Sequence, residues 1–472
     1  MIIVVLILGL TLRLISLNQS LWLDEAISLL ASKQNSFWDY ITQYLQADFH
    51  PPGYFIILWI WTHTFGFSEI SARIPSVIFG VVTIWYVYKL GVLIKNRQLA
   101  LTAALLIAVN PLHIYYSQEA RMYEFAAMAS AMSFYYFLKL QNLSRFGFLK
   151  YGASTTLLLS SDYVASLTIL SQIVVLIFAQ SKNWWKEVLK GWILVALAGA
   201  AFLPLLIKQL KIGIDTTTNF PVWKEVVGQA TAKSLGLTLV KFLLGRISFY
   251  NKILYGLIAG GMGLAYGWFV SRGVVGRNKF IPSLIYWFLV PLTLSFIISF
   301  WIPIFSYFRV LFILSPLMIL AALGIDSLSH KWRETALTSI VVTQLIFGGI
   351  YLFNPRFQRE NWREAVSFLE LRNPQAKILF ESNDSFSPFK YYAQDNLQTL
   401  GALEMMPAQR DSDVVDLKTK LKGDKTIFLV DYLVDITDPQ RFVAAAIERK
   451  GYLNTITHDF AGVGFIYEYT LK

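Results

Sequence analysis

The chain has 472 residues, of which 55% are hydrophobic and only 15% are charged, and its formal net charge is +11. Soluble domains carry roughly a quarter charged residues, so this composition excludes a wholly water-soluble protein of this length. The lysines and arginines lie in short clusters between apolar runs, which argues against a nucleic-acid-binding protein and indicates a membrane topology. The absence of cysteine excludes disulfides, a thiolate nucleophile and a cysteine-ligated zinc site.

Apolar runs long enough for membrane helices begin at Met1 and stop near Phe353. A spanning helix needs ~20 mostly apolar residues. The first run, residues 1–18, resembles a signal peptide, but no small-residue cleavage site follows it, so we expect a retained helix. Hydropathy predicts about eleven crossings in all. The later spans are predicted at 74–94, 98–114, 123–140, 148–161, 163–180, 190–207, 252–271, 280–300, 307–326 and 335–352.

Basic residues fall in alternate loops and thereby predict the orientation. With the N-terminus in the cytoplasm, five successive cytoplasmic loops carry Lys and Arg, as the positive-inside rule requires. The loop from Lys208 to Tyr250 is then an outer loop that contains several lysines, which a long loop tolerates. The basic residues of the cytoplasmic loops are Lys95 and Arg97; Lys139, Arg145 and Lys150; Lys182, Lys186 and Lys190; Arg272, Arg277 and Lys279; Lys331 and Arg333.

The first outer loop, residues 19–53, contains the adjacent carboxylates Asp24 and Glu25. A capping-box pattern begins at Ser36 and is followed by apolar residues at helical spacing, so we predict two short amphipathic helices on the outer membrane surface. Placing two carboxylates at a lipid boundary costs free energy unless cations or a metal pair with them, or a water-filled cavity hydrates them. The alternative is an acidic pair stabilised by a helix N-terminus.

The same loop ends in Asp48-Phe-His50-Pro-Pro-Gly53 and leads into a short apolar segment, Tyr54–Phe65. Proline suits the first turn of a helix. The segment is too short for a full span, and counting it as one would invert every later loop, so we predict an interfacial helix. His50 is either a hydrogen-bonded surface histidine or a ligand-binding residue.

Another outer turn places Glu119 and Arg121 among Tyr115, Tyr116 and Tyr123. One interpretation is an interfacial aromatic belt with a local ion pair. The other is functional: the arginine fork binds a phosphate, and the tyrosines pack against a sugar ring.

Arg73 and Arg309 lie at two further outer helix ends. Snorkelling towards the membrane surface explains each arginine alone. Together with Arg121 they would bring cationic groups to one membrane face, which suits an anionic lipid headgroup.

The mixed polar and apolar composition of residues 355–472 is typical of a small soluble α/β domain. Amphipathic and apolar patterns there predict helices and short buried strands. An odd number of crossings puts this domain outside the cytoplasm. The predicted helices are 361–371 and 438–449, and the predicted strands are 377–380, 426–430 and 463–469.

In order and spacing, these motifs resemble the prokaryotic dolichyl-phosphate-mannose-protein mannosyltransferase-like group, glycosyltransferase family 39 of the GT-C superfamily. They also resemble the aminoarabinose transferases that act on lipid A. The motifs are Asp24-Glu25, His50-Pro51-Pro52-Gly53, Ala72-Arg73-Ile74-Pro75-Ser76, Ser117-Gln118-Glu119-Ala120-Arg121-Met122-Tyr123, Arg309-x6-Pro316 and Asn361-Trp362-Arg363-Glu364-Ala365.

The resemblance implies a mainly α, polytopic GT-C membrane domain at residues 1–354 and an extracytoplasmic α/β domain at 355–472. It makes Asp24, the first acidic residue of the loop, catalytic. The family's Arg-Tyr pair is Arg309-Val310 here, so the aromatic partner is missing. Aminoarabinose transferases carry Lys where this chain has His50, which argues against an aminoarabinose substrate.

The expected activity is an inverting hexosyl or pentosyl transfer from a polyprenyl-phosphate-linked donor to a protein, lipid or glycan hydroxyl. It would take place at the outer face of the cytoplasmic membrane, with Asp24 as general base. In this hypothesis Arg121, Arg309 and His50 bind the donor phosphate; Glu25 and Glu119 are supporting acids; Tyr115, Tyr116, Tyr123 and Arg73 contact sugar or lipid.

A divalent cation, Mg or Mn, is an open alternative, with Glu25, His50 and Glu119 as candidate ligands. Two other functions were weighed. A transporter or flippase of lipid-linked sugars would typically show internal repeats and charges in mid-membrane, and neither is evident. A non-catalytic scaffold for the 355–472 domain leaves the elaborated first loop unexplained.

Overall fold

The computed structural model divides the chain into two compact units. The membrane unit comprises Met1–Leu17 and Ser32–Phe353, and the α/β unit comprises Asn18–Ala31 and Asn354–Lys472. Part of the first outer loop, which the sequence led us to group with the membrane domain, thus clusters with the α/β unit. The described residues are 1–46, 48–142, 145–200, 202–219, 228, 230–276, 278–394, 396–421 and 423–472, so the predicted loop residue Arg277 lies outside them.

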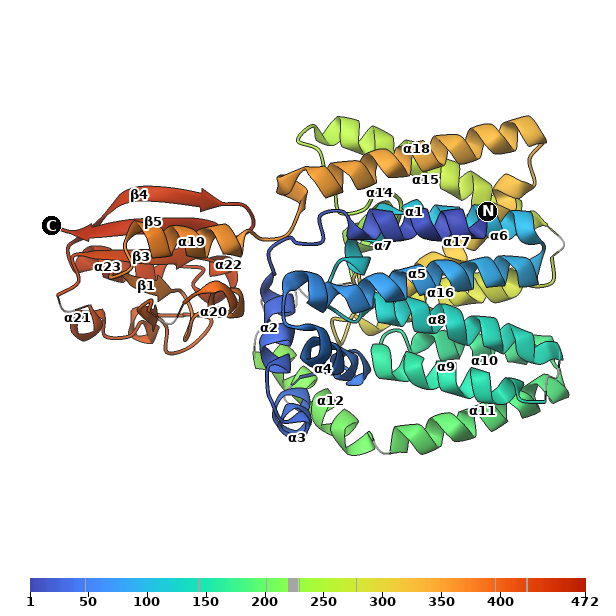
Figure 1. Cartoon of the computed structure of the whole chain (residues 1–472), viewed down its shortest axis with the longest axis horizontal. Coiled ribbons are helices and arrows are strands. Elements are labelled where there is room, and N and C mark those ends of the chain that lie inside the picture. Colours follow the sequence, from blue (N-terminus) through green and yellow to red (C-terminus); the bar gives the residue numbers. More distant parts are fainter. Residues whose placement is uncertain are drawn as a thin grey trace. The chain divides into compact units, whose positions relative to one another are not determined.

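The membrane unit is built from helices, many of which run side by side (Figure 1). Every predicted span contains a helix, and the predicted interfacial helix is α4. The helices are α1 (Ile2–Leu14), α3 (Phe37–Asp39), π-helix η1 (Tyr40–Leu45), α4 (Gly53–Phe65), α5 (Glu69–Ile94), α6 (Arg97–Val109), α7 (Pro111–Ser117), α8 (Tyr123–Lys139), η2 (Leu140–Asn142), α9 (Gly147–Ser161), α10 (Leu167–Ala179), α11 (Lys182–Ala200), α12 (Leu203–Asn219), α14 (Ala232–Leu244), α15 (Lys252–Val275), α16 (Ile281–Ile298), η3 (Leu311–Ile313), α17 (Leu314–Asp326) and α18 (His330–Phe353).

Length and composition identify the membrane-crossing helices among the described residues. Four helices, α5, α15, α16 and α18, are long and apolar enough to cross, and there are up to six if each bent pair is one span. The bent pairs are α6 with α7 and α11 with α12, and the helix at α1 is among the shorter apolar ones. The chain is therefore a multi-pass membrane protein, while the total of about eleven crossings and their orientation stay predictions.

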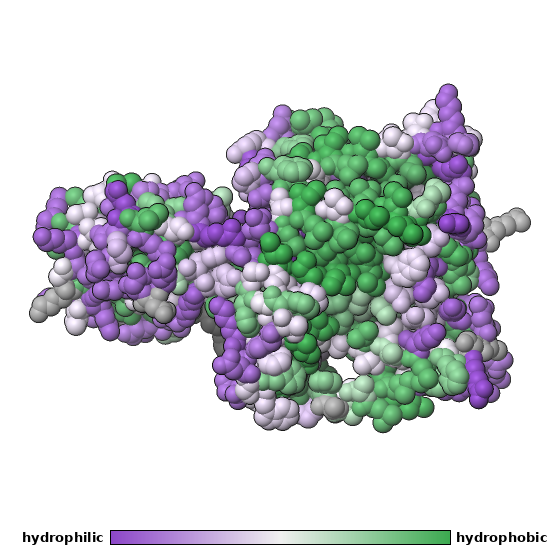
Figure 2. All heavy atoms as spheres, viewed as in Figure 1, coloured by the Kyte–Doolittle hydropathy of each residue, from purple (hydrophilic) through white to green (hydrophobic). Residues whose placement is uncertain are grey.

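The surface of the membrane unit is apolar over a broad area, bordered by hydrophilic residues (Figure 2). Phe178, Leu197 and Leu264 are 68%, 69% and 77% exposed. In a lipid environment, such side chains are solvated by acyl chains. Inside, α15 and α17 approach closely because Gly324 has no side chain: a Cβ there would lie 1.8 Å from the Phe269 carbonyl oxygen.

A sharp break separates α6 from α7, in the turn that the sequence predicts to be outside. The two helices bend by 63° at Asn110 and Pro111. The Asn110 side chain accepts hydrogen bonds from the backbone N–H groups of Leu112 and His113, and Pro111 occupies the first turn of α7. The short helix α7 therefore starts in a fixed direction and carries Tyr115 and Tyr116.

The α/β unit contains a five-stranded mixed sheet in the order β2-β1-β3-β5-β4. Strand β1 is parallel to β2 and β3, whereas β5 is antiparallel to β3 and β4. The strands are β1 (Lys377–Phe380), β2 (Thr399–Gly401), β3 (Thr426–Asp431), β4 (Tyr452–Phe460) and β5 (Gly464–Leu471). Its helices are α2 (Leu23–Ser32, of which Ser32 falls in the membrane unit), α19 (Trp362–Arg372), α20 (Ser387–Tyr392), α21 (Leu417–Lys420), α22 (Val434–Thr437) and α23 (Phe442–Arg449).

The three predicted strands match β1, β3 and β5, and the helix predicted at 361–371 matches α19. The helix predicted from Asp438 begins only at Phe442, because Arg441 adopts a left-handed φ of 60°. The Asp438 carboxylate nevertheless accepts hydrogen bonds from the N–H groups of Phe442 and Val443. Asp438 therefore binds the N–H groups at the start of the helix as predicted, but the helix starts four residues later than predicted.

Candidate active site

The acidic pair of the first outer loop lies in the first turn of α2, in the α/β unit. A helix N-terminus stabilises carboxylates there. Glu25 is fully buried, and its Oε2 atom lies 3.4 Å from Nε of Arg359, whose side chain is also buried. The structure pairs Glu25, which we predicted as a supporting acid, with Arg359 of the same unit.

Backbone hydrogen bonds hold the segment before α2 in place. The Leu21 N–H donates to the Tyr392 hydroxyl at 2.8 Å, and the Arg363 N–H donates to Ser20 Oγ at 3.2 Å. The Arg363 guanidinium also donates to the Asn18 carbonyl at 2.9 Å. Residues 18–25 are therefore integrated into the α/β unit, and this fixes the start of α2.

Asp24 is half-buried. It lies near a second carboxylate, Glu360, and its negative charge raises the pKa of Glu360. Glu360 accepts hydrogen bonds from the Trp362 indole N–H at 2.9 Å and from the Tyr432 hydroxyl at 3.0 Å. Burial and, to a smaller extent, the charge of Asp24 raise the pKa of Glu360 to about 7. A carboxyl that titrates near neutral pH thus neighbours the predicted catalytic residue.

In the membrane unit, Arg121 lies close to the end of the first outer loop. Its guanidinium carbon is 5.6 Å from the centre of the Phe55 ring, and its charge acts on Asp48. His50 Nδ1 is 2.6 Å from Asp48 Oδ1. Burial disfavours the Asp48 carboxylate, but the charge and hydrogen bond of His50 and the charge of Arg121 outweigh it and lower the pKa of Asp48.

The three predicted tyrosines form one aromatic cluster in the membrane unit. The rings of Tyr115 and Tyr116 lie 5.0 Å apart, and those of Tyr116 and Tyr123 lie 5.2 Å apart. Phe308 packs 5.2 Å from Tyr123, and Tyr307 packs 6.4 Å from Tyr116. The cluster therefore joins the outer turn after α7 to the segment that carries Arg309.

A cation that the sequence analysis did not single out, Arg246, adjoins this cluster. Its guanidinium donates to the Tyr115 hydroxyl and lies 4.6 Å from the centre of that ring. Tyr116, Tyr307 and the Glu119 carboxylate also interact with its charge. The Arg246 side chain nevertheless remains exposed, so an anion from solution can reach it.

The two other predicted arginines differ in their surroundings. Arg309 is half-buried and, within the described part of the chain, makes no hydrogen bond or ion pair. Arg73 is 1% exposed, and its Nη1 donates to the Leu17 carbonyl at 2.8 Å. Arg309 is therefore available to a ligand, whereas Arg73 is part of the protein interior and does not snorkel.

A buried polar network, which the sequence did not predict, connects α7 to α1 and α8. Arg13 Nη2 lies 2.7 Å from His113 Nδ1, and His113 Nε2 lies 3.4 Å from Glu124 Oε2. Arg13 Nε donates to Ser117 Oγ at 3.0 Å. Buried charges in a membrane domain are costly unless paired. Here the Arg13 guanidinium hydrogen-bonds to His113, to Ser117 and to the Ala108 carbonyl, and these bonds fix the helix that carries Tyr115 and Tyr116.

The candidate metal ligands are divided between the two units. No group of three or more His, Asp or Glu residues that could hold a metal ion occurs among the residues described by the structure. Glu25 belongs to the α/β unit, whereas His50 and Glu119 belong to the membrane unit. The divalent cation remains a prediction without a ligand set, and we assign no chemical step to it.

Comparison with known proteins gives one family match over part of the chain and several solved structures with a similar fold. Residues 49–207 match the family of dolichyl-phosphate-mannose-protein mannosyltransferases. No sequence in a set of curated proteins matches the chain.

Three solved structures share the fold along almost the whole chain. ArnT from Cupriavidus metallidurans bound to undecaprenyl phosphate is 12% identical, covers 99% of this chain and 96% of its own, and has a TM-score of 0.61. The oligosaccharyltransferase AglB from Archaeoglobus fulgidus, in complex with an inhibitory peptide and a dolichol-phosphate, is 13% identical with a TM-score of 0.57 and coverages of 99% and 74%. The mycobacterial arabinofuranosyltransferase AftD is 13% identical with a TM-score of 0.55 and coverages of 100% and 40%.

Proposed function

We propose that this chain is a mannosyltransferase-like glycosyltransferase that transfers a sugar from a polyprenyl-phosphate-linked donor to an acceptor hydroxyl. The match of residues 49–207 to the mannosyltransferase family and the shared fold of ArnT support this proposal. The transfer inverts the anomeric carbon and takes place at the outer face of the cytoplasmic membrane. The acceptor hydroxyl belongs to a protein, lipid or glycan. Relatives of this fold bind undecaprenyl phosphate and dolichol-phosphate, which supports a donor of this class.

The observation that carries the proposal is the exposed residue Arg246, whose guanidinium lies 4.6 Å from the centre of the Tyr115 ring. A guanidinium presents a planar fork of donors that matches phosphate oxygens. Arg309 and Arg121 belong to the same unit, in which the buried rings of Tyr116 and Tyr123 pack against each other. In the proposed reaction these cations stabilise the negative charge that grows on the departing phosphate.

His50 contributes through its free ring nitrogen. Its Nδ1 is engaged with Asp48, which leaves Nε2 as the nitrogen that can meet a ligand. A histidine with an orienting carboxylate can donate to a phosphate oxygen. The presence of His50 instead of Lys favours a neutral hexose or pentose over aminoarabinose.

Asp24 is the general base in this proposal. The acceptor oxygen bonds to the anomeric carbon as the bond from that carbon to the phosphate oxygen breaks. The hydroxyl proton goes to Asp24, and polyprenyl phosphate leaves with the bonding electrons. The half-buried side chain of Asp24 supports this role, because an acceptor hydroxyl can reach it.

Reconstitution distinguishes this function from transport. The purified protein is placed in proteoliposomes with a radiolabelled polyprenyl-phosphate sugar and with candidate acceptors on the outside. The proposal expects label in the acceptor and release of polyprenyl phosphate. Movement of intact labelled donor across the bilayer without release of polyprenyl phosphate would instead indicate a flippase.

A further inference from the structure

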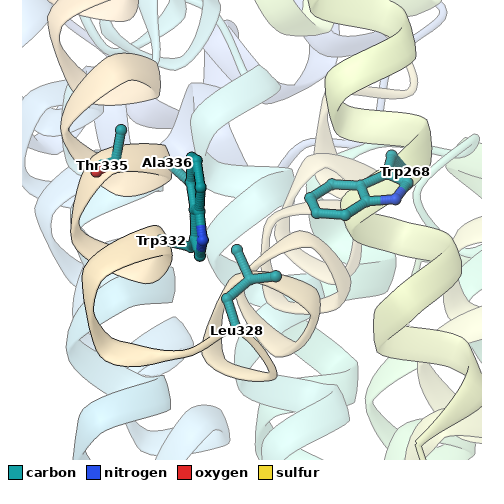
Figure 3. Close-up of a pocket in the computed structure, with 5 residues that line it drawn as sticks. All are labelled: Trp268, Leu328, Trp332, Thr335 and Ala336. Atoms are coloured by element: carbon teal, nitrogen blue, oxygen red, sulfur yellow. The ribbon is translucent and has the colours of Figure 1, made fainter.

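A cavity of about 420 Å³ lies in the membrane unit, and its lining includes none of the candidate active-site residues. Its lining comes from α15, from the turn after α17 and from the first turns of α18. Figure 3 shows the indoles of Trp268 and Trp332 on opposite sides of the space, with Leu328 between them. The lining residues are Trp268, Leu328, Trp332, Thr335 and Ala336.

The cavity is open at the surface of the membrane unit. Trp268 and Trp332 are 48% and 64% exposed, although both are large aromatic side chains. Leu264, one turn before Trp268 on the same face of α15, is 77% exposed. The apolar wall therefore continues from the cavity along α15. A cavity without polar partners holds ordered water poorly, whereas an apolar chain fits it.

The rim of the cavity is cationic. The Arg272 guanidinium carbon lies 5.2 Å from the centre of the Trp268 indole, and its Nε donates to Ser327 Oγ at 3.3 Å. Lys331 directly precedes Trp332 and is exposed. Arg272 thus lies over one of the two indoles, and Lys331 is the chain neighbour of the residue that carries the other.

The acidic residues nearby are already engaged. Asp326 binds Lys95, and Glu334 lies 3.8 Å from Arg333 and 3.7 Å from His330. Neither Arg272 nor Lys331 has a carboxylate partner in the part of the chain that the structure describes. An apolar slot beside two uncompensated cations suits an amphiphile with a negative headgroup.

We infer that this cavity binds an anionic glycerophospholipid, with one acyl chain between Trp268 and Trp332 and the phosphate beside Arg272. On the predicted topology the site lies in the cytoplasmic leaflet, at the opposite face from the proposed sugar transfer. The site recognises a bulk membrane lipid and is independent of the proposed catalytic function. Each basic residue near an anionic membrane contributes about 1 kcal/mol, which corresponds to roughly five-fold in affinity.

Native mass spectrometry of the intact, detergent-purified protein tests this inference, with titrations of phosphatidylglycerol and phosphatidylcholine that carry the same chains. We expect phosphatidylglycerol to bind more tightly, and Arg272→Gln to reduce this preference roughly five-fold. Trp332→Ala should weaken both lipids roughly ten-fold, because it removes apolar contact.

Two matched variants control for general surface effects. Arg145 also lies over an aromatic ring, 5.4 Å from the centre of Phe146, and Trp301 is 75% exposed. Arg145→Gln and Trp301→Ala should leave binding at the wild-type level. The inference is overturned if Arg272→Gln and Arg145→Gln show the same preference for phosphatidylglycerol over phosphatidylcholine. It is also overturned if inorganic phosphate alone displaces the lipid. A third contradicting result is a wild-type dimer that becomes a monomer in Trp332→Ala while the amount of bound lipid stays the same.

Discussion

Glu25 Oε2 lies 3.4 Å from Arg359 Nε, and both side chains are buried in the α/β unit. The pair joins the first turn of α2 to the segment that follows the membrane helices. Asp24, the proposed base, is the neighbour of Glu25 in that turn. The position of the base therefore depends on an ion pair that is formed within the C-terminal domain.

Replacing either member of this pair leaves an uncompensated buried charge. Glu25→Gln and Arg359→Gln should each destabilise the α/β unit by about 3–5 kcal/mol. The double variant should recover part of this loss, because neither charge then remains. Chemical denaturation followed by tryptophan fluorescence measures the effect.

The control for this pair is Arg449→Gln, which breaks an exposed ion pair with Asp411. Exposed pairs contribute about 0–1 kcal/mol, so this variant should unfold almost like the wild type. Equal losses for Arg359→Gln and Arg449→Gln would contradict the importance of the buried pair.

Glu360 should make stability depend on pH. Its folded-state pKa of about 7 lies above the ordinary value of 4.5, so the folded protein binds more protons than the unfolded chain between these values. Stability should therefore fall as the pH rises from about 4.5 to 7, by at most about 3 kcal/mol. Thermal melts of wild type and Glu360→Gln across this range measure the difference, and the Gln variant should lack this slope. Parallel curves for the two proteins would show that Glu360 titrates normally.

Arg246→Gln should lower the rate of sugar transfer roughly 100- to 1000-fold, the usual effect of losing one preorganised donor to a developing anion. Arg246→Lys keeps the charge but loses the fork, so it should recover only part of the rate. Initial rates in the proteoliposome assay provide the measurement. Lys233→Gln is the control, since Lys233 is exposed on α14 of the same outer loop. If Arg246→Gln and Lys233→Gln transfer sugar equally fast, Arg246 does not hold the phosphate.

Close packing of α15 and α17 predicts a sharp difference between two glycines. Gly324→Ala should destabilise the membrane unit by about 1–3 kcal/mol, because the new Cβ would overlap the Phe269 carbonyl. Gly260→Ala on α15 has open space around the new methyl group and should be tolerated. Thermal stability in detergent compares the two, and equal melting temperatures would refute this packing.

Much of the helical fold could be predicted from the sequence, because apolar runs in a membrane chain have few alternatives to helix. The strands at 377–380 and 426–430 were equally predictable, since parallel strands that are buried on both faces are continuously apolar. Strand β4, Tyr452–Phe460, was not, because most of its side chains are exposed and polar.

The site was only partly predictable. Motif order indicated Asp24, His50 and Arg121, but partners distant in sequence, such as Arg359 for Glu25, leave no local pattern. Arg246 did leave a signal: it lies in the one outer loop whose positive charge violated the topology rule. We interpreted that excess as tolerance in a long loop, whereas one of its charges adjoins the tyrosine cluster.

The central claim is that Asp24 takes the acceptor proton, and one comparison tests it most directly. Asp24→Asn keeps the shape of the side chain and removes the base, while Asp39→Asn makes the same change at an exposed position in the same loop. We predict that Asp24→Asn abolishes measurable sugar transfer from the polyprenyl-phosphate donor, that it leaves donor binding intact, and that Asp39→Asn transfers at the wild-type rate. Wild-type transfer by Asp24→Asn would contradict the account.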